Sequence, residues 1–179
     1  MSALTEIACR CGEVAFDLTG KPITIAACYC DSCRRAADRL EALEGAPPIT
    51  EPDGSTRYVL QRKDRARCTR GEERLRAFRL TPASTTRRVV AACCNSPVYL
   101  DFQGGHWASF YAKRWPDGEG PPARVRTMTI DAPPRPLLAD DVPSAKRQPL
   151  SFMGKLLVAW IAMGFLVPEV AKVEGEIHA

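Results

Sequence analysis

The cysteines are the feature of this sequence that most constrains its fold. Seven of the eight lie in three short clusters: Cys9-Arg-Cys11-Gly, Cys28-Tyr-Cys30-Asp-Ser-Cys33 and the adjacent pair Cys93-Cys94. Two cysteines one residue apart on an extended strand direct their sulfur atoms to the same face of the strand. Such pairs are poorly placed to form a disulfide with each other and well placed to share a metal ion.

The middle cluster offers three thiolates, Cys28, Cys30 and Cys33, and has no histidine nearby. Zinc prefers three or four such ligands in a tetrahedron, and a zinc ion held by three protein ligands keeps one position open for a substrate. A structural role without catalysis, a cluster without metal, or a fourth ligand supplied by the fold are the alternatives. Cys68 stands alone among charged residues and is interpreted as a free thiol.

The composition is that of a globular protein with one substantial core. The chain has 179 residues, of which 45% are hydrophobic and 26% charged, and its net charge is +4. The first residues lack the basic and apolar pattern of a signal peptide, so we expect a cytoplasmic protein, in which clustered cysteines bind metals or act in redox chemistry. The basic stretch 57–76 alternates with acidic residues and has few aromatics, so no nucleic acid is expected as a partner.

The chain divides into four parts. Residues 1–130 predict a mainly β domain, in which one helix over 32–43 follows the second cysteine cluster. Short alternating patterns predict its strands at 14–18, 23–27, 58–60, 75–80, 88–92, 98–102, 107–111 and 126–130. Residues 131–149 form a proline-rich extended linker, 150–168 an apolar C-terminal helix, and 169–179 a charged tail that is expected to fray.

The apolar helix is interpreted as a buried element or as the interface of a homodimer. Its uninterrupted apolar run, Leu156 to Val167, has 12 residues. A helix that crosses a bilayer needs about 20, so membrane insertion is not expected. Attachment to a membrane surface is the less favoured alternative, because the helix is apolar on every side rather than amphipathic.

The cysteine motifs resemble those of the glutathione-dependent formaldehyde-activating enzymes, a family of carbon–sulfur lyases. The matching residues are C-R-C-G-E-V at 9–14, C-Y-C-D-S-C-R at 28–34 and C-C-N-S-P at 93–97. The order and spacing of the three motifs fit over residues 5–112. The resemblance implies an Mss4-like β-tent of short antiparallel strands, stabilised by zinc; the C-terminal helix lies outside it.

The family resemblance also implies two zinc sites with different roles. Cys28, Cys30 and Cys33 match the ligands of the catalytic zinc, and Cys9 and Cys11 match the first half of a structural site. The second half of that site departs from the family motif: Cys94 matches one expected cysteine, Ala91 stands in place of the other, and Cys93 is the substitute. Both adjacent cysteines can bind one ion only if the backbone turns before Asn95-Ser96-Pro97.

These observations predict a zinc-dependent carbon–sulfur lyase-like enzyme. Its reaction is the addition of a thiol such as glutathione to formaldehyde or another small carbonyl, or the reverse. Small thiols and carbonyls are therefore the expected partners. A zinc-stabilised binding module without catalysis is the main alternative, because family members without formaldehyde chemistry exist; a redox or metal-buffering protein is the third.

Several polar residues near the motifs are secondary candidates. Asp31 and Ser32 lie inside the metal loop and are placed to hydrogen-bond the thiolates. Arg34 and Arg35 follow at the start of the helix, where they either hold a substrate carboxylate or are solvated. His106 precedes a predicted strand and is either a proton shuttle, a fourth ligand or, as loop histidines more often are, merely solvated.

Overall fold

The structure, a computed structural model, describes residues 4–134 and 138–179 and is mainly β, as predicted. Two α-helices, α1 (Asp31–Glu41) and α2 (Leu150–Ile161), accompany the strands. The strands are β1 (Leu4–Ala8), β2 (Ala15–Thr19), β3 (Thr24–Cys28), β4 (Thr56–Arg62), β5 (Ala66–Arg70), β6 (Leu75–Phe78), β7 (Thr86–Ala91), β8 (Ser96–Phe102), β9 (Trp107–Tyr111) and β10 (Val125–Thr127). Short 3₁₀ turns are η1 (Lys63–Arg65), η2 (Glu72–Arg74), η3 (Ala112–Arg114) and η4 (Thr129–Asp131).

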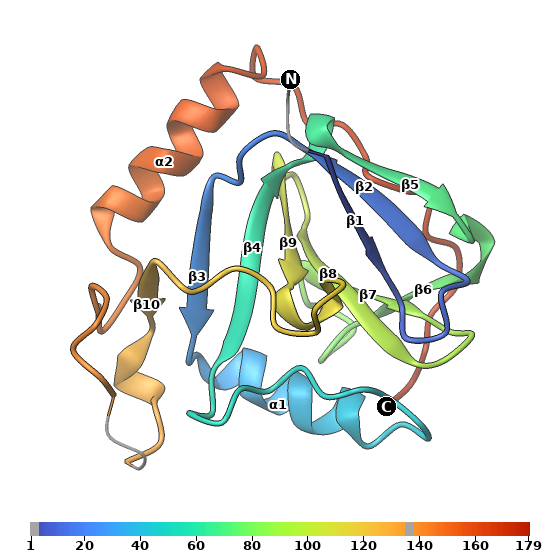
Figure 1. The fold of residues 1–179 in the computed structure, drawn as a ribbon, viewed down its shortest axis with the longest axis horizontal. Helices are drawn as coiled ribbons and strands as arrows, with labels where there is room; N and C mark the ends of the chain where they lie inside the picture. The colour runs from blue at the N-terminus through green and yellow to red at the C-terminus, as the bar shows by residue number, and fades with distance from the viewer. Residues whose placement is uncertain (1–3, 135–137) are drawn as a thin grey trace.

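The strands form two sheets. The smaller has the order β1-β2-β5, and the larger has the order β10-β3-β4-β9-β8-β7-β6. Pairing is antiparallel except between β10 and β3, which run parallel. Figure 1 shows α1 across one end of the large sheet and α2 beside its β3 edge. One face of the large sheet therefore packs against the small sheet, and the other packs against the helices.

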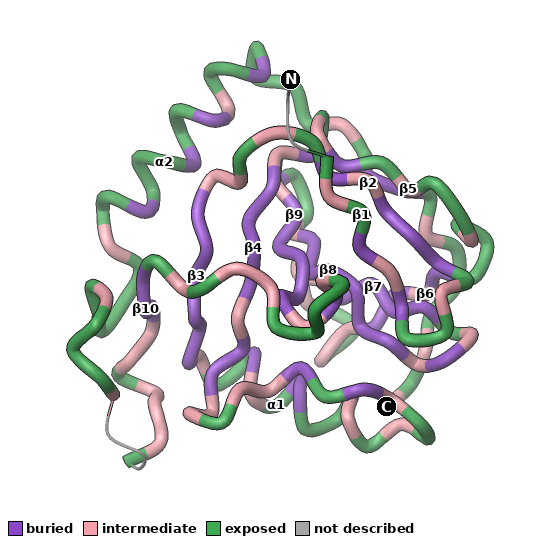
Figure 2. Tube along the Cα trace, viewed as in Figure 1, coloured by how far each residue is buried: buried purple, intermediate pink, exposed green. Residues whose placement is uncertain are grey.

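The two faces of the large sheet carry two separate cores, because successive residues of a strand point to opposite sides. On β7, Val89 packs in the core shared with the small sheet, whereas Val90 packs in the core covered by the helices. On β9, Phe110 and Tyr111 divide in the same way. Figure 2 shows that the central strands are buried along most of their length, as two-sided covering requires.

Eight predicted strands overlap observed ones, and two observed strands were missed. β1 was not predicted at all, and β5 lies within the charged stretch that was interpreted only as a solvated strand face. The last predicted strand, 126–130, is too long: β10 ends at Thr127 because Met128 adopts a left-handed conformation with φ 57° and leads into η4.

The prediction of the C-terminal helix was wrong about where it ends. α2 ends at Ile161 rather than at 168. Gly164 and Phe165 adopt φ values of 62° and 61°, and the Phe165 N–H donates to the Trp160 carbonyl at 3.0 Å. A left-handed turn at glycine is a common way to end a helix, so the stop comes before Pro168.

The expectation that the charged tail frays was also wrong. The tail runs along the outer edge of β6, where the Ala77 N–H donates to the Gly175 carbonyl at 3.1 Å and the Ile177 N–H donates to the Ala77 carbonyl at 2.9 Å. Val170 and Ala171 are buried. An edge strand offers unpaired backbone groups, and the tail satisfies them despite its charged side chains.

The proline-rich segment, as far as the structure describes it, runs along β10. The Arg126 N–H donates to the Pro143 carbonyl at 2.8 Å, and the Ala145 N–H donates to the Arg126 carbonyl at 2.9 Å. Arg126 also pairs with Asp141 at 2.7 Å. These contacts hold the start of α2 close to the edge of the large sheet.

We expect Gly71, between β5 and η2, to be essential for the close approach of the chain after β5 to the turn between β1 and β2. Its φ is 72°, and a Cβ atom there would lie 2.3 Å from the backbone oxygen of Glu13. Gly104 has the same φ, but a Cβ atom added at Gly104 would meet no other atom within 4 Å. The variant Gly104→Ala should therefore lose about 1 kcal/mol of stability from backbone strain alone. Gly71→Ala should lose about 1–3 kcal/mol more, because the backbone must shift.

Urea unfolding followed by circular dichroism measures both free energies. Equal losses in the two variants would show that the close approach of Gly71 to Glu13 does not limit the packing.

Candidate metal centres

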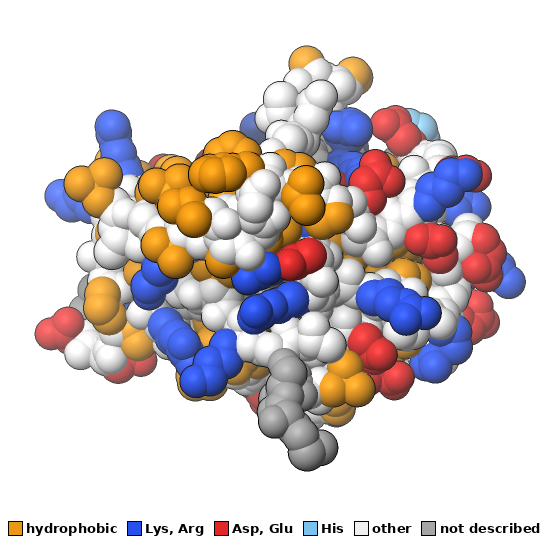
Figure 3. All heavy atoms as spheres, turned by 90° about the horizontal axis from the view of Figure 1, so that it is seen from above, with side chains coloured by type: hydrophobic (Ala, Val, Ile, Leu, Met, Phe, Trp, Pro, Cys, Tyr) orange, Lys and Arg blue, Asp and Glu red, His pale blue; other side chains and the backbone are white. Residues whose placement is uncertain are grey.

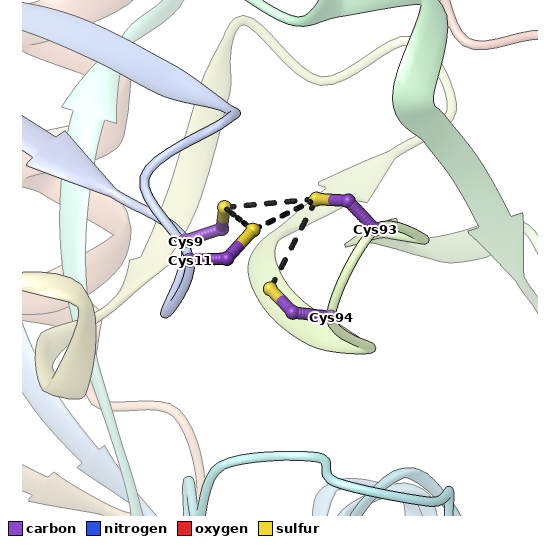
Figure 4. Close-up of side chains that lie close together, drawn as sticks. All are labelled: Cys9, Cys11, Cys93 and Cys94. Carbon is purple, nitrogen blue, oxygen red and sulfur yellow. Dashed lines mark hydrogen bonds between the residues drawn. The ribbon is translucent and has the colours of Figure 1, made fainter.

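The structure brings Cys9, Cys11, Cys93 and Cys94 together, and their four sulfur atoms lie within 4.8 Å of one another (Figure 4). The shortest sulfur–sulfur distances are 3.5 Å for Cys9–Cys11, 3.8 Å for Cys9–Cys93, 3.4 Å for Cys11–Cys93 and 4.0 Å for Cys93–Cys94. A tetrahedral ion with metal–sulfur bonds of about 2.3 Å requires sulfur–sulfur distances of about 3.8 Å. The four thiols therefore already have the spacing of a tetrahedral thiolate site.

Two tight turns produce this geometry. Cys9 and Cys11 lie in the turn between β1 and β2, and Cys93 and Cys94 lie in the turn between β7 and β8. Asn95 adopts φ 52°, so the backbone does turn immediately after the adjacent cysteines. This turn allows both neighbouring side chains to face the same point, as the sequence required for a four-ligand site.

Hydrogen bonds around this cluster favour the thiolate form of Cys94. Burial opposes ionisation, but Ser96, whose hydroxyl lies 3.1 Å from the Cys94 sulfur, and donors from Cys11 and Cys9 lower the pKa of Cys94 to about 7. Burial raises the pKa values of Cys9 and Cys93. The Val14 N–H also donates to the Cys9 sulfur at 3.3 Å, which fixes the sulfur in the turn.

The second cluster consists of Cys28, Cys30 and Cys33, whose sulfur atoms also lie within 4.8 Å of one another. Cys28 ends β3, Cys30 is the N-cap of α1, and Cys33 lies in its first turn. Among the residues that the structure describes, no fourth cysteine, histidine or carboxylate joins this group. The arrangement therefore supplies three metal ligands and leaves the fourth direction to the surroundings.

Contacts within this cluster favour negative charge on one of its three thiols. Hydrogen bonds from Cys28 and Cys33 lower the pKa of Cys30 to about 2, and hydrogen bonding to Cys30 raises the pKa of Cys28 and, with burial, that of Cys33. The Ser32 hydroxyl lies 3.3 Å from the Cys30 sulfur, as predicted for a group that hydrogen-bonds the thiolates. Free N–H groups at a helix N-terminus further favour a thiolate.

Two residues beside this cluster were not identified from the sequence. The Tyr58 hydroxyl donates to the Cys33 sulfur at 3.6 Å. The Arg88 side chain, only 1% exposed, donates from a terminal nitrogen to the Ser32 carbonyl at 3.0 Å. A buried arginine is costly unless its charge is compensated, and no carboxylate within residues 4–134 or 138–179 forms an ion pair with it. The sequence offered one signal of this burial: Arg88 begins a predicted strand whose next residues, Val89 and Val90, are apolar.

A cavity of about 440 Å³ opens beside Cys28, Cys30 and Cys33. Its floor consists of alternate residues from five adjacent strands of the large sheet, because residues i and i+2 share a face. These floor residues are Ala26 and Cys28, Tyr58 and Leu60, Trp107 and Ser109, Leu100 and Phe102, and Thr86 and Arg88. Phe152, Met153 and Leu156 of α2 form the opposite wall.

The remaining candidates are engaged elsewhere. His106 is buried, its Nε2 lies 2.8 Å from the Leu156 carbonyl, and its ring stacks on Trp160 with centroids 5.4 Å apart. It therefore holds α2 and is neither a ligand of the cysteine clusters nor a solvated loop residue. Arg34 donates to the Asp131 carbonyl at 2.6 Å, and Arg35 pairs with exposed Asp31 at 3.7 Å.

Comparison with known proteins supports the resemblance that the cysteine motifs predict. Residues 4–46 match the family model of the glutathione-dependent formaldehyde-activating enzymes, a stretch that contains all five cysteines of the first two motifs. A search of curated proteins finds no match. A crystal structure of a Rhodobacter sphaeroides protein, a structural genomics target, aligns with a TM-score of 0.45 and 16% identity, covering 78% of this chain and 99% of that one.

We expect the two clusters to bind one metal ion each and to differ in their effect on stability. Cys11→Ser should lose one equivalent of metal and more than about 3 kcal/mol of stability, because the four-cysteine site joins turns that are distant in the sequence. Cys30→Ser should lose one equivalent with a smaller effect on stability. Elemental analysis and urea unfolding measure the two quantities.

Cys68→Ser is the matched control, because its thiol lies outside both clusters and donates to the Arg70 carbonyl at 3.4 Å. It should retain both metal equivalents. Similar melting of Cys11→Ser and Cys30→Ser would contradict the difference between the sites.

Proposed function

We propose that this protein is a zinc-dependent carbon–sulfur lyase-like enzyme that adds a thiol to a small carbonyl compound, or reverses that addition. The observation that carries the proposal is the group of Cys28, Cys30 and Cys33, which offers three metal ligands at the edge of a cavity. The match of residues 4–46 to the glutathione-dependent formaldehyde-activating family supports glutathione or a similar thiol as the co-substrate.

The reaction is balanced without a redox partner. A bond forms between the thiol sulfur and the carbonyl carbon, the carbon–oxygen π bond breaks, and the thiol proton ends on the oxygen. The product is a thiohemiacetal, and its decomposition is the lyase direction. When bound, zinc with one open position supplies a way to keep an incoming thiol ionised near neutral pH.

The residues of this chain perform distinct tasks around that centre. Cys28, Cys30 and Cys33 would hold the ion, and the hydroxyls of Ser32 and Tyr58 hydrogen-bond two of their sulfurs at 3.3 and 3.6 Å. Such contacts orient the ligands and reduce their charge density. The apolar walls of the cavity keep water away from the reacting thiol, which strengthens every electrostatic interaction there.

Arg88 would compensate the charge of the metal-loaded cluster. A divalent ion held by three thiolates would carry one net negative charge, and a single guanidinium would balance it. Arg88 also fixes the loop that carries Cys30 and Cys33 through its hydrogen bond to the Ser32 carbonyl. A buried arginine without a carboxylate partner is accounted for by a metal–thiolate group of this charge.

Cys9, Cys11, Cys93 and Cys94 are proposed to hold a second zinc ion with a structural role. Their spacing suits a closed tetrahedral site, and all four positions around the ion would be filled by protein sulfur. A site of this kind contributes to folding and leaves no place for a substrate.

We expect purified, metal-loaded protein to accelerate the exchange between formaldehyde and glutathione. Exchange spectroscopy by NMR measures the rate directly at equilibrium, without a coupled enzyme. Cys30→Ser should abolish the acceleration while circular dichroism shows an intact fold, because one of three ligands is lost. Cys68→Ser should retain the full rate.

The proposal would be contradicted if the protein bound two equivalents of zinc but did not accelerate the exchange of formaldehyde with any small thiol. That result would favour a zinc-stabilised binding module of the same fold.

A further inference from the structure

The size of the cavity beside Cys28, Cys30 and Cys33 points to a substrate larger than formaldehyde. Its volume is about 440 Å³. At about 30 Å³ for each water-sized group, this is room for about fifteen non-hydrogen atoms. Formaldehyde has two and would leave most of the space unfilled.

The lining of the cavity is apolar. Leu60, Leu100, Phe102 and Trp107 contribute from the sheet, and Phe152, Met153 and Leu156 from α2. Five hydroxyls and one amide also line it, those of Ser32, Tyr58, Thr86, Ser109, Thr127 and Gln148, but the exposed surface is mainly apolar, and Arg88 is the single cationic side chain among the described lining residues. A ligand that fills this space must therefore present mainly apolar surface.

Charge limits the ligand further. With zinc bound, the three thiolates would leave one net negative charge, which Arg88 would balance, and the ionised thiol of the proposed function would add one more. No second cationic side chain lines the cavity among the described residues, so the carboxylates of glutathione would be unpaired there and would have to remain outside. The carbonyl compound that enters is therefore neutral.

Arg88 does not offer its Nε donor to such a ligand. The Nε atom is buried without accessible surface, and a terminal nitrogen of the same side chain donates to the Ser32 carbonyl. The apolar walls of the cavity therefore carry the binding.

We propose that the cavity binds the alkyl or aryl body of a neutral carbonyl substrate, an apolar aldehyde of about six to twelve carbons, with its carbonyl group toward the three-cysteine cluster. This inference rests on the proposed function for the addition of a thiol to the aldehyde carbon, with the thiol proton ending on the oxygen. The binding of the apolar body does not depend on turnover and can be measured alone.

The test compares two unreactive ketones, acetone and 2-octanone, on the metal-loaded protein without thiol. Each methylene buried in an apolar site tightens binding by about fourfold. We expect 2-octanone to bind at least 100-fold more tightly than acetone, as measured by calorimetry or by the fluorescence of Trp107, which lines the cavity. Equal affinities would overturn the inference.

Two neighbouring residues provide a matched pair of variants. Thr86 lines the cavity and is only partly exposed, whereas exposed Thr85 lies outside it. Thr86→Trp should weaken binding of 2-octanone at least tenfold by filling the cavity, and Thr85→Trp should not. Equal behaviour would place the ketone elsewhere on the protein and would overturn the inference.

Tight binding of 2-octanone without any acceleration of thiol exchange would instead contradict the proposed function. An enzyme that acts on formaldehyde but shows no preference for the longer ketone would contradict only the inference about the cavity.

The outer side of α2 carries a second, independent feature. Phe152, Leu156 and Ala159 face inward, but a second apolar stripe faces solvent (Figure 3). It follows the spacing of one helical face and continues into the next turn. Its members, each more than 50% exposed, are Leu150, Leu157, Val158, Ile161, Phe165 and Leu166; Met153 lies between this stripe and the cavity.

Basic residues border this stripe. Lys21 and Lys155 line a shallow groove together with Val158, and Lys146 and Arg147 precede the helix. Arg62 lines the same groove but pairs with Asp64. Residues 142–168 contain no aspartate or glutamate, so the cations beside the helix outnumber the acidic groups.

We infer that the outer face of α2 binds an anionic membrane surface. The exposed apolar side chains would enter the interfacial region, and the flanking cations would contact lipid phosphates. No helix among the described residues is long and apolar enough to cross a bilayer, which agrees with a helix that lies on the surface. This orientation differs from the buried helix expected from the sequence.

Sedimentation with vesicles tests this inference. We expect binding to phosphatidylcholine vesicles with 30% phosphatidylglycerol, weaker binding at 0.5 M salt, and little binding to phosphatidylcholine alone. Leu157→Glu with Ile161→Glu should abolish binding, whereas Leu4→Glu, at an exposed residue of β1, should not. Failure to bind anionic vesicles would overturn the inference, as would a dimer in analytical ultracentrifugation that the double variant dissociates.

Discussion

The structure depends on the contact between two turns that are more than eighty residues apart. The sulfurs of Cys9 and Cys11 meet those of Cys93 and Cys94 at distances typical of a tetrahedral thiolate site. One turn belongs to the small sheet and the other to the large sheet, so the cluster fixes how the sheets face each other. Closing so long a loop is costly in entropy, and metal–sulfur bonds are strong enough to offset that cost.

The fixed position of the two sheets determines where chemistry is possible. The face of the large sheet that packs on the small sheet is filled by side chains such as Phe16, Tyr99 and Phe110, whose rings contact one another edge-on or tilted. The opposite face is covered by the two helices together with loop residues such as Ile49 and Met128, and there the cavity and the three-cysteine cluster lie together. The four-cysteine cluster therefore lies where the two sheets meet, and the three-cysteine cluster lies beside the cavity on the other face.

Local patterns in the sequence were sufficient to predict which cysteines lie together and where most strands form. Spacing alone grouped Cys28, Cys30 and Cys33, and the turn at Asn95 allowed Cys93 and Cys94 to act together. Both predictions depend on residues within a few positions of one another.

The end of α2 was not predicted, because a single left-handed glycine turn outweighed the apolar composition that continues to Val167. The cavity could not be predicted either, because Thr86 and Arg88 lie on β7, and Ala26 and Cys28 on β3, with three other strands between them. Strand order results from the whole fold and is not encoded in any short segment, so Arg88 looked like one more charge in a basic sequence although it is among the most deeply buried side chains.

The helix α2 connects the cavity to the surface of the protein. A twelve-residue helix is only marginally stable alone, so its helical state depends on what its two apolar stripes contact. Phe152 and Leu156 line the cavity on one side, while Leu157 and Ile161 face outward on the other. A ligand in the cavity and a membrane on the outer face would each stabilise the same helix. Binding at one face would then favour binding at the other, since both draw on the free energy needed to order α2.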